Sequence, residues 1–532
     1  LWMALLLVAA GCVATAAAPP AAPAGEAEQP APVEQPAEAK PMELTVGIAN
    51  DQYRLEGDGA NLGVYPFNTN IAEPLVRLTS DYQIIPWLAE RWEYVGDNTW
   101  RFGLRQGVKF HNGDEFDAEA AKWSLEKNTR WQGLVPTTAE NIKVVDKYTL
   151  ELTTSVPFGR VLENLVHPTY AMYSPKGDPG KNPIGTGPFK LDEYKQNEFI
   201  RVVKNEDYWG EPAQLDAITF RFIPDNSARI LALQSGDVDM VSPVPQDNAS
   251  QVQAMPDVQL HVSKPSAYYA LYFATQGQEP PYDLLTDVQL RKAINYAIDR
   301  ETIVNKVYDG FADVAKSLTP PVVFPAINAG IQGFSYDLAQ AKALLAEAGW
   351  TDSDGDGVLD KDGQPLKLIL VSGFPPANLI KPLPEVIQGQ LKDIGIDVEL
   401  KEFNDVGAYY DFVDTGEFHM VIEAGNWNTA DVSFLPYTLF CGCNPEGEAI
   451  LYQRFWINDE FDQAIQDAQA TVDEEEATAA AVRTARIWVD EYTSVAPVAY
   501  IPQIAAAKSY LKGFQIHPSR ISQNWATLRI EQ

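Results

Sequence analysis

The sequence predicts an α/β protein of two or three lobes. Its 532 residues exceed the roughly 250–300 residues at which a single hydrophobic core stops growing. Within residues 384–423, segments with helical periodicity alternate with short apolar segments typical of strands, which is the order found in α/β folds. The hydrophobic content of 45% and the charged content of 21% are those of a globular protein with apolar mass for several cores.

The chain is strongly acidic. Asp and Glu together number 73 against 40 Lys and Arg, which gives a formal net charge of −33. Such a surface repels phosphate backbones, so we expect no nucleic-acid partner. Solubility is the simplest interpretation of the charge.

The first residues resemble a bacterial lipoprotein signal. Residues 1–10 are apolar but far short of the roughly 20 residues that span a bilayer. Small residues and Cys12 follow, which predicts a signal peptide at 1–11 and Cys12 as the lipidated first residue of the mature chain. The alternative is an apolar N-terminal segment with a chance cysteine.

Residues 13–40 consist mainly of Ala, Pro, Glu and Gln, without an aromatic residue. Such a composition buries too little surface to fold, and the prolines favour an extended chain. Together with Cys12, segment 12–41 is therefore predicted to tether a folded, extracytoplasmic part to a membrane.

The folded part begins with a strand at 42–49, where apolar residues alternate. Residues 98–127 predict two strands, at 99–104 and 108–110, then a turn and a helix that Asp117 can cap. Further strands are predicted at 142–152 (a hairpin), 217–222, 238–241, 268–274, 396–400 and 418–423. Further helices are predicted at 228–235, 287–298, 299–307, 337–348, 384–394 and 405–414.

Residues 185–188 read Gly-Thr-Gly-Pro, which predicts a tight backbone crossing where side chains would not fit. A phosphate-binding loop is the competing interpretation. It is disfavoured because no Lys-Ser/Thr follows and Pro188 has no amide donor.

Several of these segments resemble, in the same order, strings of the family 5 extracytoplasmic solute-binding proteins. These are the dipeptide, oligopeptide and nickel binders that feed ABC importers. The strings are NIAEPLVRLTSDYQIIPWLAERW at 70–92, WRFGLRQGVKFHNGDEF at 100–116, NPIGTGPFKL at 182–191, RFIPDNSARILALQSGDVDMV at 221–241, RKAINYAIDRETIV at 291–304 and DLAQAKALLAEA at 337–348.

The resemblance implies a fold like the type II periplasmic binding proteins, with two lobes about a hinge and an inserted extra lobe. Lobe I would comprise 42–85, 186–273 and 495–532. Lobe II would be the insertion at 86–185, and lobe III would cover 274–494. A ligand would sit in the cleft between lobes and be trapped by hinge closure.

The resemblance also indicates candidate ligand-binding residues. Trp427 and Asp431 resemble a Trp and an Asp that line the pocket in peptide-binding relatives, where the Asp meets the peptide's α-amino group. Glu73, Pro74 and Leu75 match the first-lobe strand that lines the cleft. The alternative for the first pair is a core tryptophan and a helix-capping aspartate.

Residues 351–363 fit a calcium-loop pattern. The candidate ligands are Asp352, Asp354, Asp356, Val358 and Asp360. Gly363 stands where the pattern requires a bidentate Glu, and a solvated turn is the alternative. Calcium would be structural, and no other cofactor is expected.

Cys441 and Cys443 are predicted either to form a small disulfide or to be free. Zinc is not expected because the five histidines are scattered along the chain. A catalytic triad or a pair of catalytic carboxylates cannot be argued from the spacing of residues. The family resemblance implies a binding protein and not an enzyme.

The expected function is that of a lipid-anchored, monomeric substrate-binding component of an ABC importer. It would capture a di- or oligopeptide and deliver it to a membrane permease. An oligosaccharide or a nickel chelate is the alternative ligand, and a secreted hydrolase is a distant alternative.

Overall fold

The computed structural model describes residues 41–49, 68–127, 134–276, 279–373, 382–443, 458–519 and 522–531. Residues 41–532 form one compact unit. The predicted signal peptide, Cys12 and the tether at 13–40 lie outside the described residues. Among the helices that the structure describes, none combines the length and the apolar character needed to cross a bilayer.

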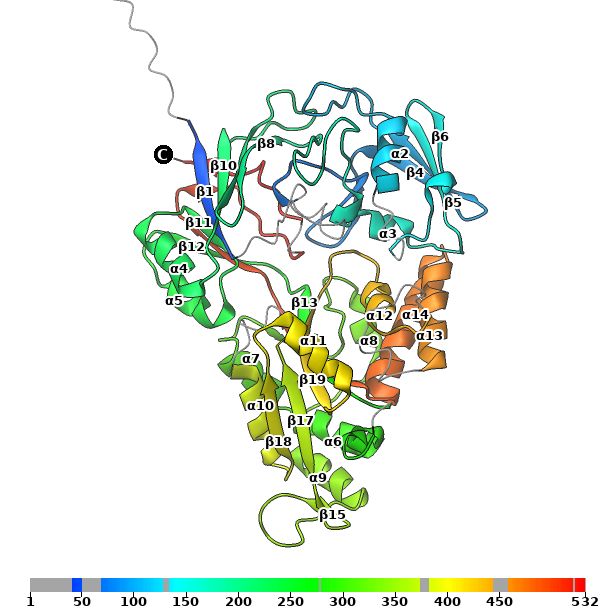
Figure 1. The fold of residues 1–532 in the computed structure, drawn as a ribbon, viewed down its shortest axis with the longest axis vertical. Helices are drawn as coiled ribbons and strands as arrows, with labels where there is room; N and C mark the ends of the chain where they lie inside the picture. Colours follow the sequence, from blue (N-terminus) through cyan, green and yellow to red (C-terminus); the bar gives the residue numbers. More distant parts are fainter. Residues whose placement is uncertain are drawn as a thin grey trace, which may run out of the picture. The chain divides into compact units, whose positions relative to one another are not determined.

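The first lobe is built on a seven-stranded sheet (Figure 1). Its strand order is β12 (Val258–Val262), β21 (Ile504–Lys508), β11 (Met240–Ser242), β1 (Glu43–Ile48), β10 (Ala217–Phe222), β9 (Phe199–Lys204) and β8 (Phe189–Lys195). β1, the strand predicted at 42–49, is central and runs parallel to both β10 and β11. The sheet thus combines segments from the start, middle and end of the chain.

Helices and the C-terminal segment cover this sheet. α4 (Asn226–Ser235) begins at Asp225, whose carboxylate accepts the Ala228 amide, and ends at Gly236 with φ 84°. α5 (Ala249–Gln253) packs with α4 in the same apolar cluster. Trp525 packs edge-on against Phe220, with 5.1 Å between ring centroids. The C-terminal segment is thereby fixed against the first lobe.

The inserted lobe contains a four-stranded antiparallel sheet in the order β4 (Ala89–Gly96), β5 (Thr99–Leu104), β7 (Thr149–Thr153) and β6 (Ile142–Asp146). Phe102 on β5 is completely buried and pairs with Leu150 on β7. α2 (Ala118–Lys127) follows, and Asp117 accepts the Ala120 amide as predicted. The second strand predicted at 108–110 is reduced to a single bridge between Lys109 and Glu115.

The third lobe is built on a six-stranded sheet. Its order is β14 (Asp313–Val314), β20 (Val495–Ile501), β13 (Ala267–Phe273), β19 (Met420–Asn426), β17 (Lys367–Ser372) and β18 (Asp397–Glu402). β13 and β20 pair with each other along their length. The predicted lobe limits at 273 and 495 therefore place these two strands in the wrong lobe.

Helices from the predicted amphipathic segments pack on the third sheet. The apolar core contains Leu370 of β17 together with Leu290 and Ile294 of α6 (Val288–Ala297), Leu345 of α9 (Leu338–Glu347) and Ile387 of α10 (Pro382–Lys392). The helices of this lobe are α6 (Val288–Ala297), α7 (Arg300–Lys306), α8 (Pro325–Gly330), α9 (Leu338–Glu347), α10 (Pro382–Lys392), α11 (Val406–Thr415), α12 (Phe434–Phe440), α13 (Asp459–Ala470) and α14 (Glu474–Arg486).

Short elements complete the fold. Within the described ranges, the other strands are β2 (Val76–Leu78), β3 (Ile84–Pro86), β15 (Asp360–Lys361), β16 (Gln364–Pro365), β22 (Leu511–Lys512) and β23 (Arg529–Ile530), and the other α-helix is α3 (Val161–Leu165). The chain passes between the two large sheets at 263–266 and at 502–503. Both crossings are only a few residues long.

The Gly-Thr-Gly-Pro segment makes the predicted backbone crossing. A Cβ on Gly185 would lie 2.0 Å from the Ile71 carbonyl oxygen, and one on Gly187 would lie 2.1 Å from the Asn70 carbonyl oxygen. Side chains are excluded at both positions, so the segment holds residues 70–71 in place.

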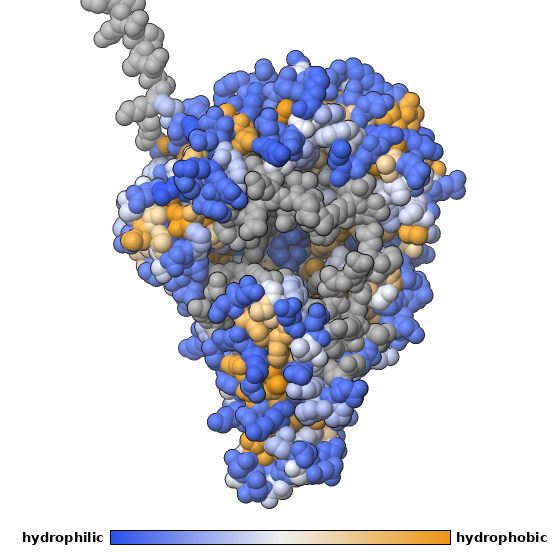
Figure 2. Space-filling model, in the orientation of Figure 1, coloured by the Kyte–Doolittle hydropathy of each residue, from blue (hydrophilic) through white to orange (hydrophobic). Residues whose placement is uncertain are grey.

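The face shown in Figure 2 is mostly hydrophilic, as the acidic composition predicts. An apolar patch lies over α4 and α5, where Leu231 is 62% exposed.

Candidate functional site

Glu73 is the centre of a buried polar cluster just before β2. Its Oε1 accepts hydrogen bonds from Trp87 Nε1 at 2.8 Å and Tyr208 Oη at 2.7 Å. Its Oε2 accepts from Trp209 Nε1 at 2.9 Å and Thr186 Oγ1 at 2.7 Å. Burial raises the pKa of the Glu73 carboxyl, and these four donors oppose that rise.

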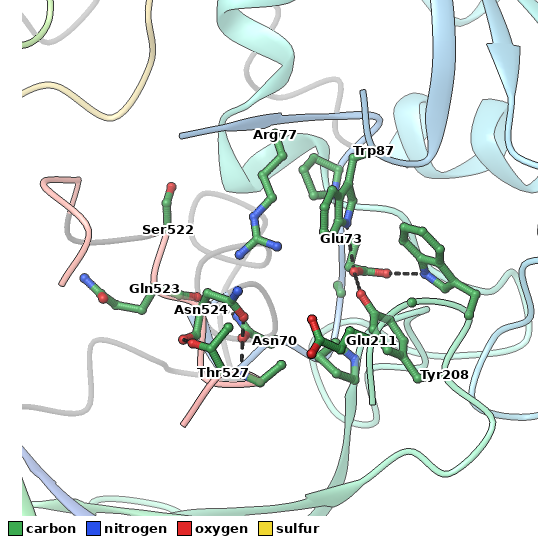
Figure 3. A pocket seen from close by; sticks show the side chains of 16 residues that line it. Asn70, Glu73, Arg77, Trp87, Tyr208, Glu211, Ser522, Gln523, Asn524 and Thr527 are labelled. Atoms are coloured by element: carbon green, nitrogen blue, oxygen red, sulfur yellow. Dashed lines mark hydrogen bonds between the residues drawn. The ribbon is translucent and has the colours of Figure 1, made fainter. Parts of the chain in front are cut away.

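A cavity of about 140 Å³ opens beside this cluster (Figure 3). Five parts of the chain line it: residues 70–77, Trp87, Pro188, residues 208–211 and the C-terminal residues 522–527. Its walls therefore come from the first lobe, from Trp87 at the start of the inserted lobe and from the C-terminal segment. The size suits a small polar group or one end of a longer ligand.

The predicted residues around Glu73 lie in different places. Pro74 lines the cavity. Leu75 is completely buried in the core of the inserted lobe and does not line the cavity. Glu73 lines it, but its carboxylate is directed to the four donors within the protein.

Sequence reasoning did not single out Arg77, Tyr208, Trp209 or the segment 522–527. The adjacent Tyr208 and Trp209 are aromatic residues with polar groups, which usually find a partner when buried. This aromatic pair just before Gly210 was the feature of the sequence that could have indicated the site. The part played by 522–527 depends on chain packing and leaves no local signal.

Trp427 follows β19 directly and is completely buried. Its indole Nε1 donates to the Leu318 carbonyl at 2.9 Å, and its own carbonyl accepts from Tyr82 Oη at 2.6 Å. The side chain belongs to an apolar core shared with the inserted lobe. This placement corresponds to the core alternative, and it offers no Trp427 surface to a ligand in this structure.

Asp431 is 2% exposed. Its Oδ2 accepts from Asn164 Nδ2 at 2.8 Å, and its Oδ1 accepts from the Ser433 amide at 2.8 Å and hydroxyl at 2.5 Å. Burial raises the pKa of this carboxyl. Asp431 lies just before α12, and both of its carboxylate oxygens already accept hydrogen bonds from the protein. A ligand ammonium would therefore have to displace one of these donors.

Next to Asp431, the inserted lobe contacts the third lobe through charged groups. Arg160 Nη1 lies 2.7 Å from Glu163 and 3.4 Å from Glu474, and Nη2 donates to the Thr471 carbonyl at 3.1 Å. Burial raises the pKa of Glu163 to about 7, with Arg160 opposing the rise and Asp431 adding to it. We call Arg160, Glu163, Asp431 and Glu474 the charged contact.

The Asp-rich loop brings three predicted ligands together. Carboxylate oxygens of Asp352, Asp354 and Asp356 lie within 4.8 Å of one another, and all three residues are exposed. Asp352 accepts the amides of Gly355 and Gly357.

The other two predicted calcium ligands lie differently. Asp360 is bonded to the Ser353 amide and hydroxyl, each at 2.8 Å, and these bonds lower its pKa. Val358 donates its own amide to Asp356 at 2.8 Å. Calcium at this loop stays a prediction.

Cys441 and Cys443 form a disulfide. It follows α12 directly and encloses only Gly442, whose amide donates to Asp462 at 3.2 Å. This decides between the two states that the sequence left open.

The fold and the cavity are those of a binding protein with lobes joined at short crossings. The family model of the bacterial extracellular solute-binding proteins, family 5 Middle, matches residues 83–446. The chain belongs to this family, whose members are the substrate-binding components of ABC importers.

Individual relatives agree with this membership. The nickel-binding periplasmic protein of Escherichia coli is 31% identical over 469 residues, which cover 84% of this chain and 87% of that protein. The crystal structure of NikA from Brucella suis with Fe(III)-EDTA matches with a TM-score of 0.80 and 25% identity, over 92% of this chain and all of that one. DppA from Helicobacter pylori with the peptide STSA matches with a TM-score of 0.72 and 25% identity, over 92% and 98%.

Proposed function

We propose that this chain captures a short peptide and delivers it to an ABC permease. The observation that supports it best is the cavity beside Glu73, which apolar surface and several polar side chains line without filling it. The Helicobacter pylori relative of similar fold holds a peptide. Preformed, largely apolar pockets fix the orientation of a ligand through a few well-placed polar groups.

A metal chelate is the second candidate ligand. The Escherichia coli relative is named as nickel-binding, and the Brucella suis structure holds Fe(III)-EDTA. Amino-acid chelates and peptides share free carboxylates, so one site can be adapted to either. We treat oligosaccharides as a third class to be tested alongside.

A thermal-shift screen of the purified protein would separate these classes. Binding to the folded state at a hundredfold excess over the dissociation constant adds about 2.7 kcal/mol of stability. A midpoint rise with peptides supports the first candidate, and a rise only with nickel–histidine supports the second. The absence of any shift, together with turnover of chromogenic hydrolase substrates, would contradict a binding role.

We also propose that lipid on Cys12 anchors the protein to the outer side of a membrane. The tether composition at 13–40 supports this placement. Cys12→Ala should move the protein from the membrane fraction to the soluble extracytoplasmic fraction. Retention of the variant in the membrane would contradict the anchor.

A further inference from the structure

Two arginines stack on one pair of tryptophans beside the cavity. The rings of Trp87 and Trp209 meet edge to face, with centroids 5.3 Å apart. The Arg77 Cζ lies 4.6 Å from the Trp87 centroid, and the Arg105 Cζ lies 4.7 Å from the Trp209 centroid. Both arginines are half-buried. The two sites are therefore closely matched, and their differences can be compared directly.

Arg105 is paired within the protein. Its Nη1 lies 3.1 Å from a carboxylate oxygen of Glu90, and its Nε donates to the Trp87 carbonyl at 3.0 Å. It does not line the cavity. Arg105 thus has a counter-charge and a fixed geometry without any ligand.

Arg77 is not paired in this way. Among the described residues, its guanidinium makes no hydrogen bond and no ion pair, and it stacks on the ring of Trp87. Glu73 acts on Arg77 only through its charge, since its oxygens are occupied by four neutral donors. Burial lowers the pKa of the Arg77 guanidinium. An unpaired cation of this kind is unusual in a chain of net charge −33.

The guanidinium points into the cavity (Figure 3). On one side lie Ser522, whose hydroxyl has no hydrogen-bond partner among the described residues, and Asn524, whose amide oxygen accepts the Ala526 amide. On the other side lies Glu211, an exposed carboxylate without an ion pair in the described chain. The Ser522 hydroxyl and the Asn524 amide nitrogen remain available as donors.

We propose that Arg77, Ser522 and Asn524 form a subsite for a carboxylate of the transported solute. The inference rests on the proposed function and adds the group that the solute must carry. Stacking on Trp87 holds the planar guanidinium in one orientation, which suits two parallel N–H···O bonds to a carboxylate. The source of the carboxylate is either a peptide C-terminus or a chelating amino acid.

Calorimetric titration would test the subsite with defined probes. These are dialanine, dialanine amide and nickel–histidine, each titrated into the wild-type protein, Arg77→Gln and Arg105→Gln. Because hydrogen bonds to charged groups are strong, we expect the wild type to prefer the acid over the amide by about 10- to 100-fold. Arg77→Gln should reduce that preference to within about threefold, and Arg105→Gln should keep it. If Arg77→Gln loses affinity for nickel–histidine but not for dialanine, the chelate is the source of the carboxylate.

The alternative is that Arg77 only balances the buried charge of Glu73. Arg77→Gln would then weaken acid and amide equally or lower the melting temperature alone, and either result overturns the subsite. A second measurement does not need the transported solute. Sodium acetate, compared with sodium chloride at equal ionic strength, should raise the melting temperature of the wild type and Arg105→Gln by on the order of 1 °C, but not that of Arg77→Gln.

The two tests separate the proposals. An acetate shift that depends on Arg77, without binding of any peptide or chelate, would keep the carboxylate site and contradict the transport function. If a peptide or chelate binds with an affinity that depends neither on Arg77 nor on the carboxylate, the transport function is kept and the subsite is contradicted.

Discussion

Glu73 brings a carboxylate into an interior where four neutral groups donate to it. Glu73→Gln would place an amide NH₂ against two of these donors, and buried donors without acceptors are costly. We expect the free energy of unfolding to fall by about 2–4 kcal/mol, measured by urea denaturation.

Glu211→Gln is the matched control for this prediction. Glu211 lines the same cavity but is exposed and makes no ion pair among the described residues. Its substitution should change the stability by less than about 0.5 kcal/mol. Equal effects of the two substitutions would contradict a structural role for the Glu73 cluster.

Glu163 gives a prediction for pH dependence. Its pKa rises from the usual 4.5 to about 7 in the folded protein, so the folded state binds more protons than the unfolded state between these values. As the pH rises from about 4.5 to 7, the Glu163 carboxyl therefore lowers the free energy of unfolding, by about 3 kcal/mol in all. In Glu163→Gln, this part of the pH dependence of the unfolding free energy should be absent.

The measurement is the difference in unfolding free energy between wild type and Glu163→Gln across this pH range. The difference is needed because burial lowers the pKa of His111, His167 and His517 to about 4, which destabilises the folded state as the pH falls below 6.5. A difference that stays constant with pH would contradict the raised pKa of Glu163.

The residue types of the site were predictable, but their surroundings were not. Trp427 and Asp431 stand out in the sequence, yet Trp427 donates to Leu318, and Asp431 accepts from Asn164, which is 267 positions away. Whether a carboxylate is free for a ligand depends on such distant donors. Arg77 illustrates the converse, because its lack of a partner cannot be read from its neighbours in the chain.

At the scale of elements, the crossing at 185–187 is the most constrained segment. Gly185→Ala would place a methyl group 2.0 Å from the Ile71 carbonyl oxygen, so the backbone must move. Overpacking of this kind costs about 1–3 kcal/mol, and we expect a lower melting temperature. Gly389→Ala in α10 is the control, since its Cβ would meet nothing within 4 Å and alanine favours helix. An unchanged melting temperature in Gly185→Ala would contradict the steric constraint at this crossing.

The Asp-rich loop is predicted to bind calcium weakly. Three carboxylates already converge, but Asp360 must leave Ser353 to join them, and Gly363 supplies no carboxylate. We expect calorimetry on chelator-treated protein to show a dissociation constant of about 10⁻⁴–10⁻³ M, and Asp354→Asn to weaken it further. No heat with calcium would leave the loop as a set of solvated turns.

Local periodicity predicted the individual elements well. Apolar alternation predicted β1, and helical periodicity predicted α6, because both patterns depend on neighbouring residues. It failed for 108–110, where only one bridge forms. The lobe limits implied by the family resemblance placed β13 and β20 in the wrong lobe, since strand partners are determined by packing between distant segments.

At the scale of the whole molecule, the charged contact joins the inserted lobe to the third lobe. Arg160→Ala would leave Glu163 and Glu474 without their cation at this junction. We expect faster hydrogen exchange at 159–165 and 469–474, with unchanged exchange in the central strands of both large sheets.

Arg483→Ala is the control for the charged contact. Arg483 also bridges two carboxylates, Glu460 and Glu491, but both lie within the third lobe and are exposed. Arg483→Ala should leave hydrogen exchange at 159–165 unchanged. The same exchange pattern in both variants would contradict a specific role for Arg160 between lobes.

The position of the last strands has a consequence for how the chain is made. β20 lies between β14 and β13 in one large sheet, and β21 lies between β12 and β11 in the other. Neither sheet can be completed until residues 495–508 have been synthesised, so an emerging chain exposes unfinished strand edges until then. Completion of both large sheets thus depends on one short segment, and a chain stopped before residue 495 would lose a strand from each sheet.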